Sequence, residues 1–377
     1  MCICFICFII VSKIYTKYVV DSFLLCFYYK KKMTMTIEQR ISAFAQLGNM
    51  LTTNECIAQA IDVATLSNPW FTRQNIEYSI SAIASTLKYD NLAEWVQQYS
   101  FTEDTTPKTI AIIMAGNIPL VGFHDFLCVL MSGNKAMCKL SSNDNVLLPA
   151  VAKVLISIEK GFEDMIVFCE NKMQGFDAVI ATGSNNTSRY FEYYFGKYPN
   201  IIRHNRNSIA ILHGNESKAE LEYLCDDIFL HFGLGCRSVN KLYVPTGYNF
   251  QPLIEAAQKY SHLFDHHIYH SNFDYHKALL MLNNVPFVDG GFFAMKEDKL
   301  MYSPVSIINY EYYDNINSIF RTNTDIFYIN HRTIQNYKLY LYESEYTSIY
   351  MLKIRILIIY IGGTKNQEQI TGIHPVI

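Results

Sequence analysis

Two stretches of this 377-residue chain lack alanine, glycine and proline altogether, namely residues 1–32 and residues 316–361. Ordinary proteins contain about 7% glycine and about 5% proline, so several of these residues would be expected in each stretch. Both stretches are instead rich in isoleucine, tyrosine and phenylalanine, which AT-rich codons specify. We therefore predict that residues 1–32 are a spurious extension translated from upstream sequence, with Met33 or Met35 as the start. By the same argument, residues 316–377 are predicted to be an atypical tail read through a frameshift.

The chain also lacks a long uninterrupted apolar segment at its head. Residues 1–32 begin with an apolar run, but Lys13 and Lys17 interrupt it. A membrane-spanning helix needs about 18 or more consecutive apolar residues, so we expect no membrane span. The alternative interpretation of this head segment is a membrane anchor.

An excess of positive charge is missing as well. The net charge of −3 and the isoelectric point near 6.4 give no electrostatic basis for binding nucleic acid. The ten cysteines are irregularly spaced, no convincing secretory signal is present, and only Cys4 and Cys7 form a Cys-x-x-Cys pair. This usage favours a reducing cytoplasm over a disulfide framework.

The length allows two domains with substantial cores. Residues 33–105 alternate polar and apolar residues at helical spacing, which predicts a helical N-terminal layer with Trp70 and Trp95 in its core. Residues 106–212 alternate strands with helices, as the βαβ units of a parallel sheet do. Residues 213–315 are predicted to form a second, catalytic α/β domain.

Cys236 is the first candidate for a catalytic residue. It lies in the segment Phe-Gly-Leu-Gly-Cys-Arg-Ser, directly before a strand-like run. The glycines at 233 and 235 leave room for a substrate carbonyl to approach both the thiol and backbone N–H groups, which can stabilise a tetrahedral intermediate. The alternative interpretation is a buried cysteine that acts as a small hydrophobic residue.

Two further segments place polar residues at predicted strand ends. A strand over Thr109–Met114 precedes Asn117, and a second strand over Ala136–Leu140 contains Lys139. A third strand ends in Thr182-Gly-Ser184 and is followed by a helix. Open parallel sheets bind ligands at the carboxyl ends of their strands, and the free N–H groups of a helix start suit a pyrophosphate.

The order of these motifs resembles the aldehyde dehydrogenase superfamily. Asn-x-Pro at 117–119, Gly-Asn-x4-Lys at 133–139, Thr-Gly-Ser at 182–184 and a cysteine about 50 residues further on are in that family's order. Three more segments resemble its acyl-CoA reductase branch, the LuxC-like fatty-acid reductases: Asn68-Pro-Trp-Phe-Thr72, Ala115-Gly-Asn-Ile-Pro119 and Ser303-Pro-Val305. The resemblance covers roughly residues 35–315. It implies an α/β fold with a Rossmann-type cofactor domain.

The resemblance implies catalytic roles for Cys236 and Asn117. Cys236 would attack an acyl-CoA thioester and expel CoA, and the resulting acyl-enzyme would be reduced to aldehyde. The side-chain amide of Asn117 and the backbone N–H of Cys236 would stabilise the negative oxygen. Asn117 can alternatively be read as a turn residue before Pro119. Arg203, His204, His231 and Arg237 remain alternatives for the cation that would favour the thiolate.

The resemblance also implies cofactor-binding residues. Lys139 matches a lysine that contacts the adenosine ribose, and Gly183 and Ser184 match the pyrophosphate site. Many relatives carry a glutamate three residues after that lysine, where this chain has Ser142. An acid would repel the 2′-phosphate of NADP, so Ser141 and Ser142 favour NADPH, with NADH left open. A solvated lysine and an ordinary tight turn are the alternative interpretations.

The chain departs from the family pattern at three places. Aldehyde-oxidising members carry a glutamate that activates water, whereas the matching stretch 203–208 here contains no carboxylate. Leu234 replaces a polar residue of the cysteine motif, and Leu300-Met-Tyr-Ser-Pro304 replaces the segment that usually holds the nicotinamide ribose. Without a water-activating base, an acyl-enzyme is protected from hydrolysis, as transfer to or from CoA requires.

Five histidines, at 262, 266, 267, 270 and 276, lie close together in the sequence. Pairs spaced by four residues could bind zinc on a helix, but no cysteine lies among them and the superfamily uses no metal. We therefore expect a solvated histidine-rich surface and no metal site.

These observations predict a cytoplasmic enzyme that reduces a fatty acyl-CoA to the aldehyde with NADPH. We expect it to have no membrane span and no nucleic-acid partner. A homo-oligomer is expected from the resemblance. Two alternatives remain open: an acyl-phosphate reductase of the same fold, and a catalytically inactive product of a damaged reading frame.

Overall fold

The structure is a computed structural model that describes residues 35–99, 106–203, 207–315, 319 and 326–329. The predictions for residues 1–32, including the start site and the membrane-anchor alternative, lie outside the described residues. So does most of the predicted tail at 316–377. None of the helices in the described ranges is long and apolar enough to cross a bilayer.

Four helices form the N-terminal layer, which confirms that part of the predicted fold. They are α2 (Ile37–Met50), α3 (Glu55–Ser67), α4 (Arg73–Thr86) and α5 (Tyr89–Gln97). The first three begin at residues that cap them: Thr36, Asn54 and Thr72 each accept a hydrogen bond from a backbone N–H of the first turn.

The two tryptophans of this layer differ in burial. Trp95 is buried in the core of the layer, as predicted. Trp70 is only half-buried and packs against two cores, that of the first half of the chain and that of the second. The prediction for Trp70 was therefore wrong in part, because the break at Asn68-Pro69 places it between α3 and α4 and outside both helices.

The first sheet has five parallel strands in the order β3-β2-β1-β4-β5. They are β1 (Thr109–Ile113), β2 (Lys135–Lys139), β3 (Ile166–Phe168), β4 (Ala178–Thr182) and β5 (Asn200–Arg203). The connecting helices are α6 (Phe123–Met131), α7 (Leu147–Ile158), the 3-10 helix η1 (Lys160–Met165) and α8 (Asn185–Phe195). The strand order reverses between β1 and β4, so their carboxyl ends border the crevice where such sheets bind ligands.

The second sheet has six strands in the order β11-β6-β7-β10-β9-β8, and only β8 pairs antiparallel. They are β6 (Asn207–Ile211), β7 (Val239–Pro245), β8 (Phe287–Asp289), β9 (Ala294–Glu297), β10 (Ile307–Tyr313) and β11 (Ile326–Ile329). The helical segments of this half are α9 (Lys218–Phe229), η2 (Leu230–Gly233), α10 (Gln251–Ala257), η3 (Gln258–Asp265) and α11 (His267–Leu282). The domain boundary that we placed after residue 212 stays a prediction. The strand β6, which lies before that boundary, belongs to the second sheet.

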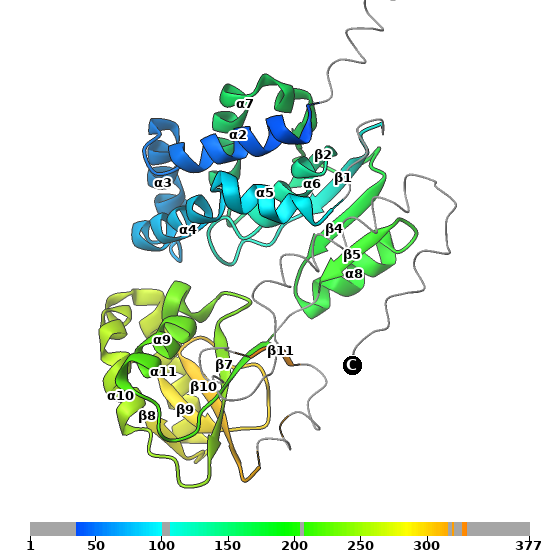
Figure 1. The fold of residues 1–377 in the computed structure, drawn as a ribbon. Coiled ribbons are helices and arrows are strands. Elements are labelled where there is room, and N and C mark those ends of the chain that lie inside the picture. The colour runs from blue at the N-terminus through cyan, green and yellow to red at the C-terminus, as the bar shows by residue number, and fades with distance from the viewer. Residues whose placement is uncertain (1–34, 100–105, 204–206, 316–318, 320–325, 330–377) are drawn as a thin grey trace, which may run out of the picture.

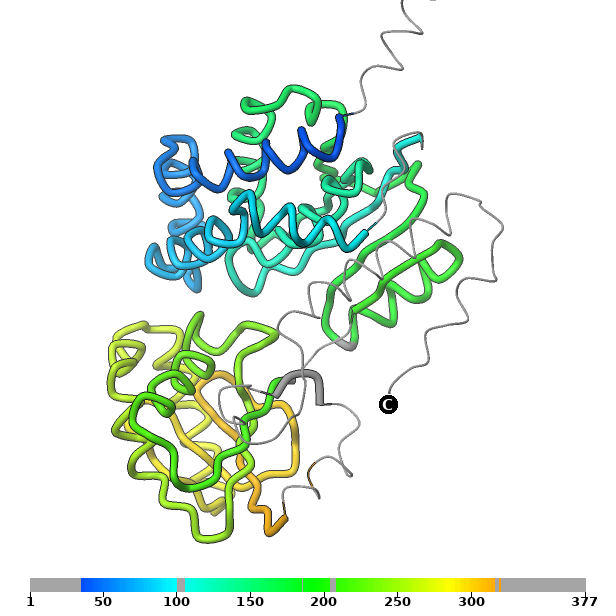
Figure 2. Tube along the Cα trace, viewed as in Figure 1, coloured from blue at the N-terminus to red at the C-terminus, as the bar shows by residue number. Residues whose placement is uncertain are grey.

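Figure 1 shows how the two halves of the chain are arranged. The helical layer with β1 and β2 lies at the top, β4, β5 and α8 lie to the right, and β7–β10 with α9–α11 lie at the bottom. Figure 2 shows the same division, with the blue-to-cyan chain above and the yellow chain below. Within the predicted tail, β11 pairs in parallel with β6 at the edge of the second sheet.

Candidate active site

A cavity of about 350 Å³ brings together residues from both halves of the chain. Asn117 follows β1, Gly183 and Ser184 follow β4, and Cys236 precedes β7. The segment Ser303–Val305, which precedes β10, completes the set of sequence motifs in the cavity wall. Four of the seven predicted site residues therefore lie around one cavity: Asn117, Gly183, Ser184 and Cys236.

The loop that carries Cys236 has an unusual backbone. His231, Phe232 and Gly233 all have positive φ, at 52°, 59° and 72°. Non-glycine residues rarely adopt this conformation, and such strain is typical of functional sites. Leu234 N–H then donates to the carbonyl of His231 at 3.0 Å, which closes the turn. The turn leaves Cys236 exposed at the cavity.

The other cysteines near the site are different. Cys128 and Cys138 are completely buried, and burial raises the pKa of each thiol. A buried, protonated thiol is a poor nucleophile. Of these three cysteines, Cys236 is therefore the one placed for covalent chemistry.

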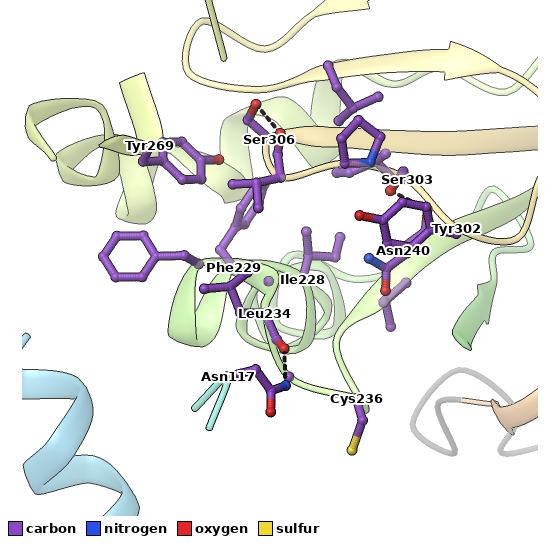
Figure 3. Close-up of a pocket in the computed structure, with 18 of the residues that line it drawn as sticks. Asn117, Ile228, Phe229, Leu234, Cys236, Asn240, Tyr269, Tyr302, Ser303 and Ser306 are labelled. Carbon is purple, nitrogen blue, oxygen red and sulfur yellow. Dashed lines mark hydrogen bonds between the residues drawn. The ribbon is translucent and has the colours of Figure 1, made fainter. Parts of the chain in front are cut away.

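Asn117 links the first half of the chain to the cysteine loop. Its side-chain Nδ2 donates to the carbonyl of Leu234 at 2.6 Å, as Figure 3 shows. A carboxamide nitrogen carries two N–H donors. One N–H orients the side chain through Leu234, and the second is available for an oxygen atom in the cavity.

The segment Asn68–Thr72 joins the two halves, a role that its sequence alone did not reveal. Asn68 Nδ2 donates to the carbonyl of Asn143 at 3.0 Å, and its Oδ1 accepts from Trp70 N–H at 3.0 Å. The Trp70 ring meets Phe232 edge-on, with centroids 5.2 Å apart, and stacks on His266 at 5.4 Å. This segment thus holds the loop after β2 and the cysteine loop together.

Asp144 supports the turn that carries Asn117, and the sequence analysis missed it. Its Oδ2 accepts from the backbone N–H of Leu120 at 2.7 Å, and Leu120 has a positive φ of 57°. Burial raises the pKa of the Asp144 carboxyl to about 6, although the N–H groups of Leu120 and Leu147 oppose the shift. Four polar residues in a row, at 141–144, were the available sequence signal.

A buried ion pair lies beside the cavity. Both guanidinium nitrogens of Arg203 contact the Asp125 carboxylate, at 2.5 and 2.7 Å, and Nη1 also donates to Thr182 Oγ1 at 3.2 Å. The two side chains are only 11% and 9% exposed. Burial alone would lower the pKa of Arg203, but the charge of Asp125 outweighs it and raises that pKa, with smaller contributions from Cys128 and Cys236. Arg203 is thus a permanent positive charge held beside the cavity.

The other candidates for a cation near Cys236 differ from Arg203 in charge or in burial. Burial lowers the pKa of His231 to about 4, so this imidazole is neutral at pH 7. His204 lies outside the described residues. Arg237 is exposed and directly follows the cysteine. Arg203 is the buried, fixed cation of the group.

The predicted ribose-side residues lie apart from the thiol. Lys139 Nζ donates to the carbonyls of Glu170 and Asn171, at 2.9 and 3.2 Å. Ser142 is exposed, and neither it nor Ser141 or Lys139 is among the residues that line the cavity. Lys139 is the last residue of β2 and the two serines follow it, one strand further from the cavity than β1.

The crevice between β1 and β4 fits the phosphates of a dinucleotide. Ser184 caps α8, accepting from Thr187 N–H at 3.3 Å, so the first turn of this helix begins at the cavity. A Cβ at Gly183 would lie 2.9 Å from Phe191, and one at Gly116 would lie 2.5 Å from Ser141 Oγ. Glycine at both positions leaves room for these neighbouring side chains, and Gly183 lies next to the start of α8, where free N–H groups suit a phosphate.

The five histidines lie in η3, at the N-cap residue His266 and in α11. His266 Nε2 contacts the carbonyl of Pro69 at 2.8 Å, and His270 contacts Asp274 at 3.2 Å. Among the residues with described positions, no group of three His, Cys, Asp or Glu is arranged to hold a metal ion.

The fold and the cavity define an α/β oxidoreductase of the aldehyde dehydrogenase fold, with an exposed cysteine where the two halves meet. Residues 39–263 match the family described as acyl-CoA reductase (LuxC). The chain therefore belongs to the LuxC acyl-CoA reductase family, which confirms the resemblance seen in the sequence. Its members act on an acyl group as oxidoreductases.

Solved structures support the fold. The chain is similar to an aldehyde dehydrogenase from Bacillus cereus solved with NAD⁺, with a TM-score of 0.57 and 14% identity over 76% of this chain and 69% of that one. An NADP-dependent enzyme from E. coli gives a TM-score of 0.58 and 14% identity, over 76% and 70%. An oxidoreductase from Marinobacter aquaeolei gives 0.59 and 12%, over 76% and 71%. No curated protein sequence matches the chain significantly.

Proposed function

We propose that this protein reduces a fatty acyl-CoA thioester to the aldehyde with NADPH, through an acyl-enzyme on Cys236. The observation that carries the proposal is the exposed Cys236 thiol in a cavity that also contains Asn117 and the Gly183-Ser184 turn. Most of the remaining wall is apolar, including Ile228, Phe229 and Val239, as an acyl chain requires.

The first step is acyl transfer. The Cys236 thiolate attacks the thioester carbonyl, a new carbon–sulfur bond forms, and the intermediate collapses with departure of the CoA thiolate. The second N–H of Asn117 and the backbone N–H of Cys236 would donate to the negative oxygen. Arg203, paired with the buried Asp125 carboxylate, would place a fixed positive charge beside this part of the site.

The second step is reduction of the acyl-enzyme. A nicotinamide cofactor, with its pyrophosphate at Gly183 and Ser184, would supply a hydride when bound. The same two N–H donors would stabilise the oxygen of the thiohemiacetal on Cys236. Its collapse releases the aldehyde and returns the cysteine to its thiolate form.

The lack of an acidic residue among the described residues of the cavity wall favours acyl transfer from CoA over hydrolysis of the acyl-enzyme. Among the described residues, no aspartate or glutamate lines the cavity. The nearby carboxylate of Asp125 accepts hydrogen bonds from both guanidinium nitrogens of Arg203, so it is not placed to activate a water molecule. An acyl-enzyme at Cys236 therefore has no carboxylate base beside it in this part of the structure.

For the cofactor, we propose NADPH, with Lys139, Ser141 and Ser142 near the adenosine ribose. Ser142 is exposed, and a neutral hydroxyl at this position would not repel the 2′-phosphate as an acid would. NADH remains the alternative. We further propose a cytoplasmic location and a homo-oligomer.

The test is NADPH oxidation, followed by absorbance, with a long-chain acyl-CoA as substrate. We expect aldehyde and free CoA thiol in equal amounts. An acyl-phosphate reductase, the alternative of the same fold, would instead be active with an acyl phosphate and release no thiol. A folded protein that binds NADPH and turns over neither substrate would favour the damaged reading frame.

A further inference from the structure

One hydroxyl group in the cavity wall has no hydrogen-bond partner. Tyr269 lines the cavity, its side chain is only 1% exposed, and its hydroxyl is unpaired within the described part of the chain. Nearly all buried hydroxyls are hydrogen-bonded, because burial removes their hydration. An unpaired one that faces a cavity therefore marks a place where a polar group of a ligand can bind.

The Tyr269 ring is held firmly in this position. It belongs to the first turn of α11, where its backbone N–H donates to His266 Nδ1 at 3.4 Å. Its ring packs against Phe232, with centroids 6.0 Å apart. Burial raises the pKa of the Tyr269 phenol, so the group keeps its proton and remains a donor at neutral pH.

Ser306 supplies a second polar atom at the same end of the cavity. It is buried, lines the cavity and has a positive φ of 68°. Figure 3 shows the Tyr269 hydroxyl pointing toward it. The Ser306 hydroxyl donates its own proton to the carbonyl of Val305, so its oxygen offers only acceptor sites to a ligand.

Tyr269 and Ser306 together can bind a hydroxyl group of a ligand. Tyr269 offers a proton and the Ser306 oxygen accepts one, whereas a hydroxyl of a ligand can both accept and donate. A keto oxygen could use only the Tyr269 proton. A methyl group would use neither the Tyr269 proton nor the Ser306 oxygen.

The position of this pair relative to Cys236 indicates which part of a substrate reaches it. In Figure 3, Cys236 and Tyr269 lie on opposite sides of the group of labelled residues, with Ile228 and Phe229 between them. All of them line one cavity. An acyl chain bound at Cys236 through its carbonyl carbon would extend along the apolar wall and bring its far end to Tyr269.

We infer that this enzyme prefers acyl-CoA substrates with a hydroxyl group at the distal end of the acyl chain. Tyr269 donates to that hydroxyl and Ser306 accepts from it, so Tyr269 determines specificity. This inference rests on the proposed function and names the substrate class of the same site.

The test compares ω-hydroxyacyl-CoA with unsubstituted acyl-CoA of equal chain length, from caproyl to lauroyl. For the chain length that fits, we expect a kcat/KM about tenfold higher for the hydroxylated substrate, as one added net hydrogen bond gives. Tyr269→Phe keeps the ring and should remove this preference. The ratio of kcat/KM for the two substrates should fall from about ten to about one.

Tyr260→Phe is the matched control. The Tyr260 hydroxyl donates to Asp226 at 2.7 Å, and Tyr260 does not line the cavity. We expect this variant to lose about 2–4 °C in Tm and keep the preference. Tyr269→Phe should lose no thermal stability, because the hydroxyl that it removes is unpaired.

Three results would overturn the inference. The first is equal kcat/KM for hydroxylated and unsubstituted chains at every length. The second is a Tyr269→Phe variant that loses activity equally on both, and the third is one that mainly loses affinity for NADPH. Failure of the proposed function is distinguishable, because then neither kind of acyl-CoA acylates Cys236; the inference would fail with it.

Discussion

On the thiol side of the site, Asn117 from the first half of the chain donates to Leu234, two residues before Cys236 in the second half. On the ribose side, Lys139 donates to the carbonyls of Glu170 and Asn171, which belong to its own half. The thiol side therefore depends on contacts between the halves, and the ribose side on contacts within one half.

This difference has consequences for mutations. On the thiol side, side chains hold the backbone in place: Asp144 accepts from Leu120 N–H, and Asn68 joins the Asn143 carbonyl to Trp70 N–H. A change there should affect stability or catalysis strongly. On the ribose side, Ser142 is exposed, so a change should affect only the choice of cofactor.

The largest effect is expected for the buried ion pair on the thiol side. Arg203→Met leaves the Asp125 carboxylate buried without its cation, which typically costs about 3–5 kcal/mol of unfolding free energy. Urea unfolding measures this cost. The double variant Arg203→Met/Asp125→Leu removes both charges and should recover a large part of it. A single variant as stable as the unchanged protein would show that the pair does not support the thiol side.

The next effect concerns the oxyanion. Asn117→Ala removes one donor and should lower kcat about 10²–10³-fold, which corresponds to about 2.7–4 kcal/mol. Single-turnover acylation of Cys236 measures it directly. The protein should still be acylated, only more slowly. An unchanged acylation rate would indicate that Asn117 is only a turn residue.

Asp144 should make stability depend on pH. Its folded-state pKa of about 6 lies above the unfolded value of about 3.9, so the folded protein binds the proton more tightly. The contribution of this group is therefore fully present below about pH 4 and is lost as the pH rises through about 6. The loss amounts to at most about 3 kcal/mol.

Asp144→Asn tests this contribution, because asparagine keeps an oxygen that can accept from Leu120 N–H. We expect the variant to gain stability relative to the unchanged protein between about pH 4 and about pH 7, measured by urea unfolding. A difference in stability that stays constant over this range would contradict the assignment.

The smallest effect is expected on the ribose side. Ser142→Glu places an acid where the 2′-phosphate would bind, and it should raise KM for NADPH about fivefold, as a partly screened charge repulsion of about 1 kcal/mol would. KM for NADH should change little. Ser142→Gln has the same size without the charge and serves as the control in steady-state kinetics. Equal effects of both variants would exclude the electrostatic explanation.

The sequence predicted the strands and their end residues well, because buried parallel strands and glycine turns leave strong local patterns. The helical layer, β1, β2 and β4 with the helix after it are all present. Asn117, Gly183 and Ser184 meet at one cavity because the carboxyl ends of neighbouring parallel strands converge, and Cys236 reaches the same cavity from the turn before β7.

Other parts of the site could not be predicted, because they depend on contacts between residues far apart in the chain. Arg203 and Asp125 are separated by 78 positions, and Trp70 meets Phe232 across the two halves. The unpaired hydroxyl of Tyr269 follows only from its burial in three dimensions. No local spacing pattern indicates such pairs.

The central claim is that Cys236 carries the acyl group. Incubation with radiolabelled long-chain acyl-CoA in the absence of NADPH should leave about one acyl group per active chain, removable by neutral hydroxylamine as a thioester is. Cys236→Ala should abolish this labelling, whereas Cys128→Ala and Cys138→Ala, which change buried thiols, should retain it. Labelling that survives Cys236→Ala would contradict the account.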